Sequence, residues 1–170
     1  MRKIALLPFT ILYWLITFTR NVLFDVGILK SFKIPGKSIS VGNLSIGGSG
    51  KTPMVQYLTR LLQEEYSIQI LSRGYGRSSK GFRQVTKLDN AQTVGDEPLT
   101  YFEKFSEKVS VFVCEKRLEG ILKMKAIHSE ATIILDDAFQ HRYVTPGLQL
   151  ILTPFQDQFI HDWHLPSGNL

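Results

Sequence analysis

The chain has 170 residues, of which 44% are hydrophobic, and it carries a formal net charge of +5. This length and composition suit one α/β domain or part of a larger protein. Because Cys114 is the single cysteine, no disulfide can form within the chain, and we expect a buried thiol in a reducing cytoplasm.

The basic residues are unevenly distributed. Residues 1–63 contain eight lysines and arginines but a single acid, Asp25. A basic segment joined to an apolar one favours an anionic membrane surface as a partner. Basic and aromatic residues are not interleaved as in proteins that bind single-stranded nucleic acid, so we expect no nucleic-acid partner.

Residues 4–19 are almost continuously apolar. As a helix they would be about 24 Å long, short of the roughly 30 Å hydrocarbon core of a bilayer. A narrow polar stripe runs along one side and consists of Lys3, Thr10, Tyr13, Thr17 and Arg20. We therefore expect a helix that lies in the membrane interface, with Tyr13 and Trp14 at headgroup level. A core helix and a secretory signal are the alternatives, and no cleavage site follows the apolar run.

Residues 45–52 form a candidate phosphate-binding loop, composed of Ser45, Ile46, Gly47, Gly48, Ser49, Gly50, Lys51 and Thr52. The loop lies between a short strand at 37–41 and a helix with apolar residues at helical spacing, namely Met54, Leu58, Leu61 and Leu62. Glycines let backbone N–H groups approach phosphate oxygens, Lys51 adds positive charge, and Thr52 offers a hydroxyl to Mg²⁺. Ser45 stands where the usual pattern has its first glycine. An ordinary glycine-rich turn before a helix is the alternative.

A second strand, at 67–71, leads into a loop at residues 72–76. In an open parallel sheet ligands bind at the carboxyl ends of strands, so this loop should lie beside the phosphate-binding loop. Arg73 could bind an anionic group and Tyr75 could stack on a sugar, but a tight turn with a solvated arginine explains the pattern equally well. Residues 78–92 are polar, and we interpret them as a surface excursion such as a hairpin.

Two adjacent carboxylates, Asp96 and Glu97, follow Gly95 and precede Pro98. Asp96 fits the N-cap of a helix that continues through Phe105, and capping alone would explain it. A catalytic base and a metal ligand would fit the same two positions. Beyond this helix we expect a third strand at 109–114 and a helix at 115–129 whose core-facing residues are Leu118, Ile121, Leu122 and Ala126.

A fourth strand, at 131–135, ends in Asp136 and Asp137. An apolar strand that ends in acid, downstream of a phosphate-binding loop, is typical of a Mg²⁺ site opposite the loop's threonine hydroxyl. A fifth strand is expected at 148–153. The pair His161 and His164 has no supporting ligand pattern, so we do not interpret it as a metal site. Residues 165–170 contain neither a capped helix nor a polar terminus, so we expect that the sequence is interrupted there.

Four motifs together resemble the tetraacyldisaccharide 4'-kinase family, the lipid A kinases of Gram-negative bacteria. They are residues 41–53, 72–76, 94–98 and 136–142, in matching order and spacing. The family usually has glycine where Ala138 stands, whereas Ser45 belongs to the family's own version of the loop. The resemblance covers about the first half of a family member and implies a second α/β domain that is absent here.

The resemblance implies ATP bound by residues 45–52, with Lys51 neutralising the transferring phosphoryl group. It implies Mg²⁺ held by Thr52, Glu97, Asp136 and Asp137. It also implies that Asp96 is the catalytic base toward the sugar 4'-hydroxyl. The disaccharide headgroup would be bound by Arg73, Tyr75 and His141.

We therefore expect a P-loop NTPase-like three-layer α/β/α sandwich over residues 35–170, preceded by a membrane-associating helical segment over residues 1–34. The expected activity is phosphorylation of the 4'-hydroxyl of tetraacyldisaccharide 1-phosphate at the cytoplasmic face of the bacterial inner membrane. The resemblance also implies that the missing C-terminal domain is a partner that completes the nucleotide site. A membrane-bound nucleotide switch without kinase activity is the alternative.

Overall fold

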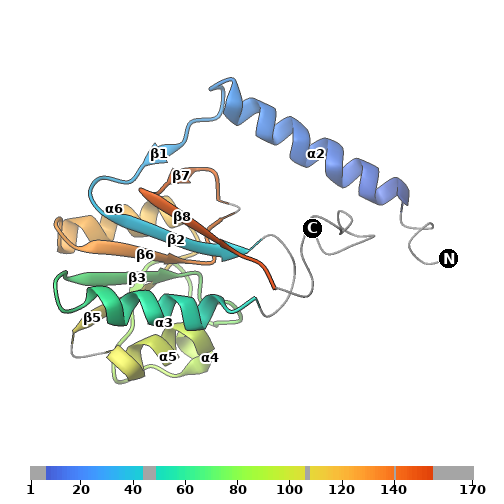
Figure 1. Ribbon diagram of the computed structural model, residues 1–170. Helices are drawn as coiled ribbons and strands as arrows, with labels where there is room; N and C mark the ends of the chain where they lie inside the picture. The colour runs from blue at the N-terminus through green and yellow to red at the C-terminus, as the bar shows by residue number, and fades with distance from the viewer. Residues whose placement is uncertain (1–6, 44–48, 106–107, 140, 155–170) are drawn as a thin grey trace.

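The computed structural model describes residues 7–43, 49–105, 108–139 and 141–154. Helices and strands alternate along most of this range, as the hydrophobic periodicity predicts (Figure 1). The elements in chain order are α2 (Leu7–Asp25), β1 (Phe32–Lys33), β2 (Ser38–Asn43), α3 (Lys51–Leu62), β3 (Ile68–Ser72), β4 (Arg83–Gln84), α4 (Ala91–Val94), α5 (Asp96–Phe105), β5 (Val109–Val113), α6 (Arg117–Ile127), β6 (Thr132–Asp136), β7 (Val144–Thr145) and β8 (Leu148–Leu152).

The main sheet has six strands in the order β4-β5-β3-β6-β2-β8. All neighbouring strands in it are parallel except β4, which pairs antiparallel with β5. The five expected strands are therefore present, and the mixed α/β fold with a mostly parallel sheet is confirmed. Because β2 and β6 are adjacent and parallel, with Val41 opposite Asp136, the loop after β2 and the acids after β6 emerge at the same edge.

Helices cover both faces of this sheet. On one face, Val55 and Leu58 of α3 and Tyr101 of α5 belong to a buried cluster with inward residues of the strands. On the other face, Ile121 and Met124 of α6 belong to a second buried cluster. Strands covered on both faces are largely apolar, which explains the short hydrophobic runs in the sequence.

The predicted inner face of α6 was largely wrong. Leu118, Leu122 and Ala126 are exposed, while Ile121 is buried as expected. Instead, the face of α6 that carries Arg117, Gly120 and Met124 lies against the sheet. A Cβ at position 120 would lie 3.0 Å from the Leu71 side chain, so the missing side chain lets α6 approach β3 closely.

On α3 the predicted apolar face was wrong at one position. Leu61 is 60% exposed, whereas Val55 and Thr59 are buried. Thr59 can be buried because its hydroxyl donates to the carbonyl of Val55 at 2.7 Å.

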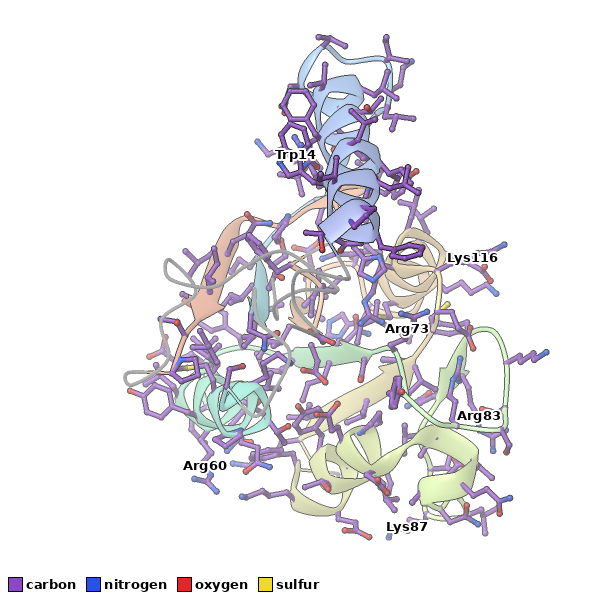
Figure 2. The ribbon with its side chains drawn as sticks, turned by 90° about the vertical axis from the view of Figure 1, so that its right-hand side faces the viewer. Trp14, Arg60, Arg73, Arg83, Lys87 and Lys116 are labelled. Carbon is purple, nitrogen blue, oxygen red and sulfur yellow. The ribbon has the colours of Figure 1, made fainter. Side chains whose placement is uncertain are left out.

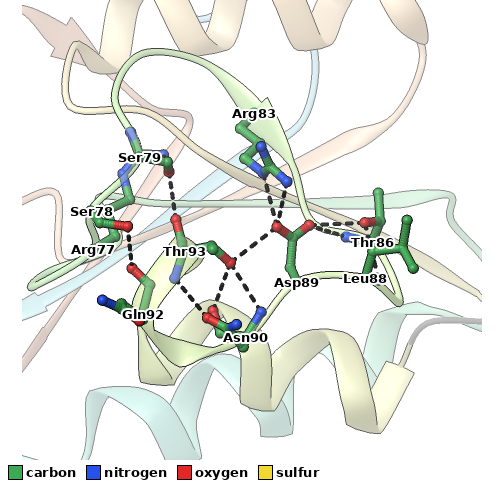
Figure 3. Close-up of polar contacts among 10 residues, drawn as sticks. All are labelled: Arg77, Ser78, Ser79, Arg83, Thr86, Leu88, Asp89, Asn90, Gln92 and Thr93. Carbon is green, nitrogen blue, oxygen red and sulfur yellow. Dashed lines mark hydrogen bonds and ion pairs between the residues drawn. The ribbon is translucent and has the colours of Figure 1, made fainter.

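The polar excursion at 78–92 does not form a hairpin of its own. Its short strand β4 pairs with β5, which comes after two intervening helices. The rest is held by Asp89, whose carboxylate accepts hydrogen bonds from Nε and Nη2 of Arg83, from N and Oγ1 of Thr86 and from Oγ1 of Thr93 (Figure 3). Asn90 then caps α4 in a capping box with Thr93.

Helix α2 stands apart from the layered body (Figure 1). It begins at Leu7, and most of its apolar side chains are exposed, among them Phe9, Ile11, Leu12, Trp14, Leu15, Ile16 and Phe18. Most of the apolar side chains of α2 are therefore not part of the core formed by the described residues. Within the described residues, no helix has both the length and the apolar character needed to cross a bilayer. Lys3, part of the predicted polar stripe, lies outside the described residues.

Candidate active site

Lys51 is the first residue of α3, directly after Gly50, whose φ of 82° favours glycine. Its ammonium donates to Oδ1 of Asn43, the last residue of β2, at 2.9 Å. The same nitrogen lies 3.5 Å from Oδ1 of Asp137. Lys51 therefore links the two strand ends on either side of the expected phosphate site. Ser45, Ile46, Gly47 and Gly48 lie outside the described residues, and the phosphate-binding role predicted for them stays a prediction.

Thr52 is joined to α5 by a hydrogen bond from its hydroxyl to Oε1 of Glu97, 3.1 Å long. One turn further along α5, Tyr101 is fully buried, and its hydroxyl has no hydrogen-bond partner among the described residues. Burial and the neighbouring charge of Asp136 raise the pKa of Tyr101 above its usual value, so it stays neutral. The predicted metal-binding positions Thr52 and Glu97 are thus brought together from elements far apart in sequence.

Asp136 is fully buried at the end of β6. Ser72, at the end of β3, donates its hydroxyl to Oδ2 of Asp136 at 3.1 Å, but Oδ1 has no partner within the described ranges. Burial, with a smaller contribution from the charge of Glu97, raises the pKa of Asp136 to about 7. A buried carboxylate with an unsatisfied oxygen is a site that a cation would stabilise.

Asp137 adopts a left-handed backbone conformation, with φ 51°. Its side chain is exposed at the sheet edge, unlike that of Asp136. The turn is held by the buried guanidinium of Arg117, which donates from Nη2 to the carbonyl of Asp136 at 2.7 Å and from Nη1 to the carbonyl of Cys114 at 3.0 Å. The two aspartates therefore leave one strand end in different directions, one inward and one toward Lys51.

The segment after the aspartates lies tightly against β2. A Cβ placed on Gly42 would be 2.4 Å from the Cβ of Phe139 and 3.0 Å from its backbone nitrogen. Any side chain at position 42 would push Phe139 away, together with Asp137 two residues earlier. A second close approach joins Gly74 to Gly95, where an added Cβ on Gly95 would be 3.1 Å from the Gly74 backbone. The loop that carries Arg73 is therefore packed against the start of α5, where Asp96 lies.

The expectation that Asp96 caps α5 was off by one residue. The helix begins at Asp96 itself, and Gly95, with φ 95°, precedes it. The carboxylate of Asp96 is exposed in the first turn of α5, where the helix dipole favours negative charge. Its neighbour Glu97 points to Thr52, so the two adjacent carboxylates are directed to different places.

The three predicted substrate-binding residues differ in their surroundings. Arg73 and Tyr75 lie on the loop after β3 and are exposed, Tyr75 at 89%. His141 is half-buried, and burial together with the positive charges of Arg117 and Arg73 lowers its pKa. The charge of Arg73 therefore acts on His141, whereas the described contacts place no partner against the Tyr75 side chain.

The predicted metal ligands do not form a closed cage. Among the described residues, no three histidine, cysteine, aspartate or glutamate side chains lie together as a metal site. An octahedral Mg²⁺ commonly uses one or two carboxylates, with phosphate and water oxygens as the remaining ligands. The donor set of Asp136 and the Thr52 hydroxyl is compatible with that arrangement.

A sequence model of the LpxK family, tetraacyldisaccharide-1-P 4'-kinase, matches residues 2–170 of this chain. The chain belongs to this family. The tetraacyldisaccharide 4'-kinases of Flavobacterium psychrophilum and Flavobacterium johnsoniae are 50% and 48% identical to it, over 98% and 100% of this chain and 48% and 50% of their own lengths. The crystal structure of the apo form of LpxK from Aquifex aeolicus in complex with ATP is 43% identical, with a TM-score of 0.87, and is matched over 100% of this chain and 54% of that one. The chain thus spans about half the length of the curated relatives it matches.

Sequence reasoning missed several residues that shape this LpxK-family site. Asn43, Ser72 and Arg117 hold Lys51, Asp136 and the turn after β6, respectively. Asn43 and Ser72 each end a strand next to a predicted loop, and that position was a signal that could have found them. Arg117 gave no such signal, because an arginine in the first turn of a helix is ordinarily solvated.

Proposed function

We propose that the protein containing this chain transfers the γ-phosphoryl group of ATP to the 4'-hydroxyl of the tetraacyldisaccharide 1-phosphate precursor of lipid A. The observation that carries the proposal is the convergence of Lys51, Thr52, Asp136 and Asp137 at one edge of a parallel sheet, in a chain of this family. The relatives' name supplies the acceptor, and the Aquifex structure supplies ATP.

In this proposal residues 45–52 cradle the triphosphate, on a P-loop NTPase-like α/β/α domain covering residues 35–170. The ammonium of Lys51 stabilises the charge that develops on the transferring phosphoryl group. Asp96 accepts the proton of the sugar hydroxyl, and its exposure at the carboxyl edge of the sheet leaves it accessible to an acceptor. Arg73, Tyr75 and His141 bind the headgroup.

Mg²⁺ fits the residues present. The unsatisfied, buried Oδ1 of Asp136 and the Thr52 hydroxyl would hold it, with Asp137 and Glu97 nearby in the same network. When bound, the cation neutralises phosphate charge during transfer. The hydrogen bond from Ser72 holds the Asp136 side chain in the orientation that this role requires.

We further propose that α2 lies in the membrane interface at the cytoplasmic face of the bacterial inner membrane, as part of a membrane-associating segment over residues 1–34. The exposed apolar side chains of α2 support this, because water does not favour so many on one surface helix. Trp14 lies on α2, and Arg73 and Lys116 lie on the body below it (Figure 2). Basic side chains on that side suit anionic lipid headgroups.

The experiment that tests the kinase proposal is a single-turnover transfer of labelled phosphate from ATP to the lipid disaccharide in mixed micelles, with the full-length protein. Asp96→Asn should lower the transfer rate by about 10²- to 10⁴-fold, the range for loss of a general base, and leave ATP affinity nearly unchanged. Glu103→Gln, an exposed position on the same helix, is the matched control. Full transfer by Asp96→Asn would show that Asp96 is not the base, whereas ATP binding without any transfer by the unaltered protein would favour the alternative, a nucleotide switch.

The membrane proposal is tested separately with vesicles that contain phosphatidylglycerol. The unaltered protein should float with the vesicles, and the pair Trp14→Ser and Phe18→Ser should reduce this binding, since both rings lie on the exposed side of α2 and stack at 5.2 Å. Leu88→Ser, an exposed leucine on the body, is the control. Equal flotation of all variants would contradict an interfacial role for α2.

A further inference from the structure

The end of α2 is held by one side chain from the segment that follows the acidic pair. The guanidinium of Arg142 donates from Nη2 to Oδ1 of Asp25 at 2.5 Å and from Nη1 to both the carbonyl and Oδ1 of Asn21 at 3.2 Å. It also lies over the ring of Phe24, 5.0 Å from the centroid. One cation therefore contacts three residues in the last turns of α2, where the helix dipole favours positive charge.

The chain around Arg142 strengthens this attachment. Ser31 donates its hydroxyl to the carbonyl of Arg142, and Tyr143 packs edge-on against Phe24 at 5.0 Å between ring centroids. The strands β1 and β7 then pair in parallel, with Phe32 opposite Val144. Phe24 is buried although most apolar residues of α2 are exposed, so this turn is where the helix is fixed to the body.

Arg142 also lies within a few residues of the site. It follows His141 directly, and Asp137 is five positions earlier. That segment cannot slide freely, because Phe139 packs against Gly42 and Arg117 binds the carbonyl of Asp136. The position of α2 and the position of the acidic end of β6 are therefore coupled through a short segment that is anchored at Asp136 and Phe139.

We propose that Arg142 is a positioning residue that sets α2 relative to the acidic end of β6, so that a lipid acceptor in the membrane that α2 is proposed to contact reaches the phosphoryl donor in register. This inference rests on the proposed kinase function. Arg142 does not touch the reacting atoms in this arrangement; it acts through Asp25, Asn21 and Phe24.

An exposed ion pair adds little to folding stability, and the Arg142 and Asp25 side chains are 37% and 64% exposed. Loss of the contact should therefore affect the geometry of acceptor delivery more than the stability of the fold. A misplacement of about 1 Å between reactants can lower a rate by about 100-fold, so an effect on transfer does not require unfolding.

The test compares Arg142→Ala, Arg142→Lys and Arg60→Ala in the full-length protein, the last being an exposed arginine on α3 that serves as the matched control. We expect Arg142→Ala to lower kcat/KM for the lipid acceptor at least 10-fold, with ATP affinity, thermal midpoint and vesicle binding unchanged. Arg142→Lys should recover part of the loss, because it keeps the charge but loses the second donor and the stacking. Arg60→Ala should match the unaltered protein.

A charge exchange gives a second test that does not depend on the alanine variant folding. Arg142→Glu alone should lose acceptor turnover, and Arg142→Glu combined with Asp25→Arg should regain at least part of it. Unchanged acceptor kinetics in Arg142→Ala would overturn this inference and leave the kinase proposal standing. A loss of acceptor turnover that is accompanied by an equal loss of thermal stability or ATP affinity would do the same. If the unaltered full-length protein fails to phosphorylate the lipid, the kinase proposal falls and this inference falls with it.

Discussion

The ammonium of Lys51 lies 3.5 Å from Oδ1 of Asp137, although the two residues are 86 positions apart in the sequence. The contact joins the start of α3 to the residue that directly follows β6. In a protein that binds a triphosphate at this edge, the lysine would exchange part of this contact for phosphate oxygens. The acid keeps the lysine extended toward that position beforehand, and Asn43 holds it from the other side.

Lys51→Ala should reduce phosphoryl transfer by about 10²- to 10³-fold, the loss typical when a preorganised charge on a transition state is removed. The measurement is single-turnover transfer to the lipid disaccharide by the full-length protein. Lys104→Ala, which removes an exposed lysine that contacts Gln56, is the control and should retain full activity. Normal transfer by Lys51→Ala would show that the ammonium has no catalytic role.

Asp136→Asn should stabilise the magnesium-free protein at pH 8 while it abolishes transfer. At that pH the buried Asp136 is ionised, because its pKa is raised only to about 7, and an uncompensated buried charge opposes folding. Below pH 7 the carboxyl of Asp136 takes up a proton in the folded protein, whereas in the unfolded chain it does so only near pH 4. The unaltered protein therefore gains stability as the pH falls, and the difference in free energy of unfolding between Asp136→Asn and the unaltered protein should shrink. Urea unfolding at pH 6 and pH 8 measures this difference, and an equal or larger advantage at pH 6 would contradict the prediction.

Gly42→Ala should destabilise the protein by about 1–3 kcal/mol, the usual cost of overpacking. In an ordinary strand the same change would be neutral or stabilising, but here the new Cβ would meet Phe139 at 2.4 Å. Transfer should also fall, because Phe139 cannot move without displacing Asp137. Gly81→Ala is a useful comparison: position 81 has a positive φ but no atom within 4 Å of an added Cβ, so its cost should be purely conformational.

Asp89→Asn should destabilise the excursion at 78–92 by about 1–3 kcal/mol. The Asp89 carboxylate accepts hydrogen bonds from Arg83, Thr86 and Thr93, and an amide cannot accept all of them (Figure 3). Hydrogen bonds from Thr86 and Arg83 outweigh desolvation and lower the pKa of Asp89, so its contribution is present above about pH 4 and is lost as the pH falls below that value. Amide hydrogen exchange in residues 78–94 at pH 7 measures the change. Leu88→Ala, at a 93% exposed side chain in the same loop, should leave exchange unaltered.

The order and type of the main strands could be predicted from the sequence because each is a short apolar run that both faces of a parallel sheet require. Their boundaries moved by only one or two residues; β3, for example, begins at Ile68 and ends at Ser72. The neighbourhood of Lys51 and Asp137 followed from one rule, that ligands bind at the carboxyl ends of parallel strands. The backbone of residues 44–48 lies outside the described residues, and its predicted shape stays a prediction.

What could not be predicted depends on contacts between distant segments. The inner face of α6 is set by the close approach of Gly120 to Leu71, which no local periodicity records. The β1 and β7 strands are two residues long, so their pairing leaves no pattern in either segment. The left-handed turn at Asp137 is held by Arg117, 20 positions earlier, and becomes visible only when the chain is folded.

The two edge strands of the main sheet, β4 and β8, differ in length and direction. At one side the two-residue strand β4, which runs against its neighbour and presents the charged Arg83, discourages the addition of a further strand. At the other side β8 offers five residues of extended backbone whose outer groups pair with no other strand in the described part of the chain. We therefore expect any further strand, whether from more polypeptide of the same protein or from a second copy, to pair with β8.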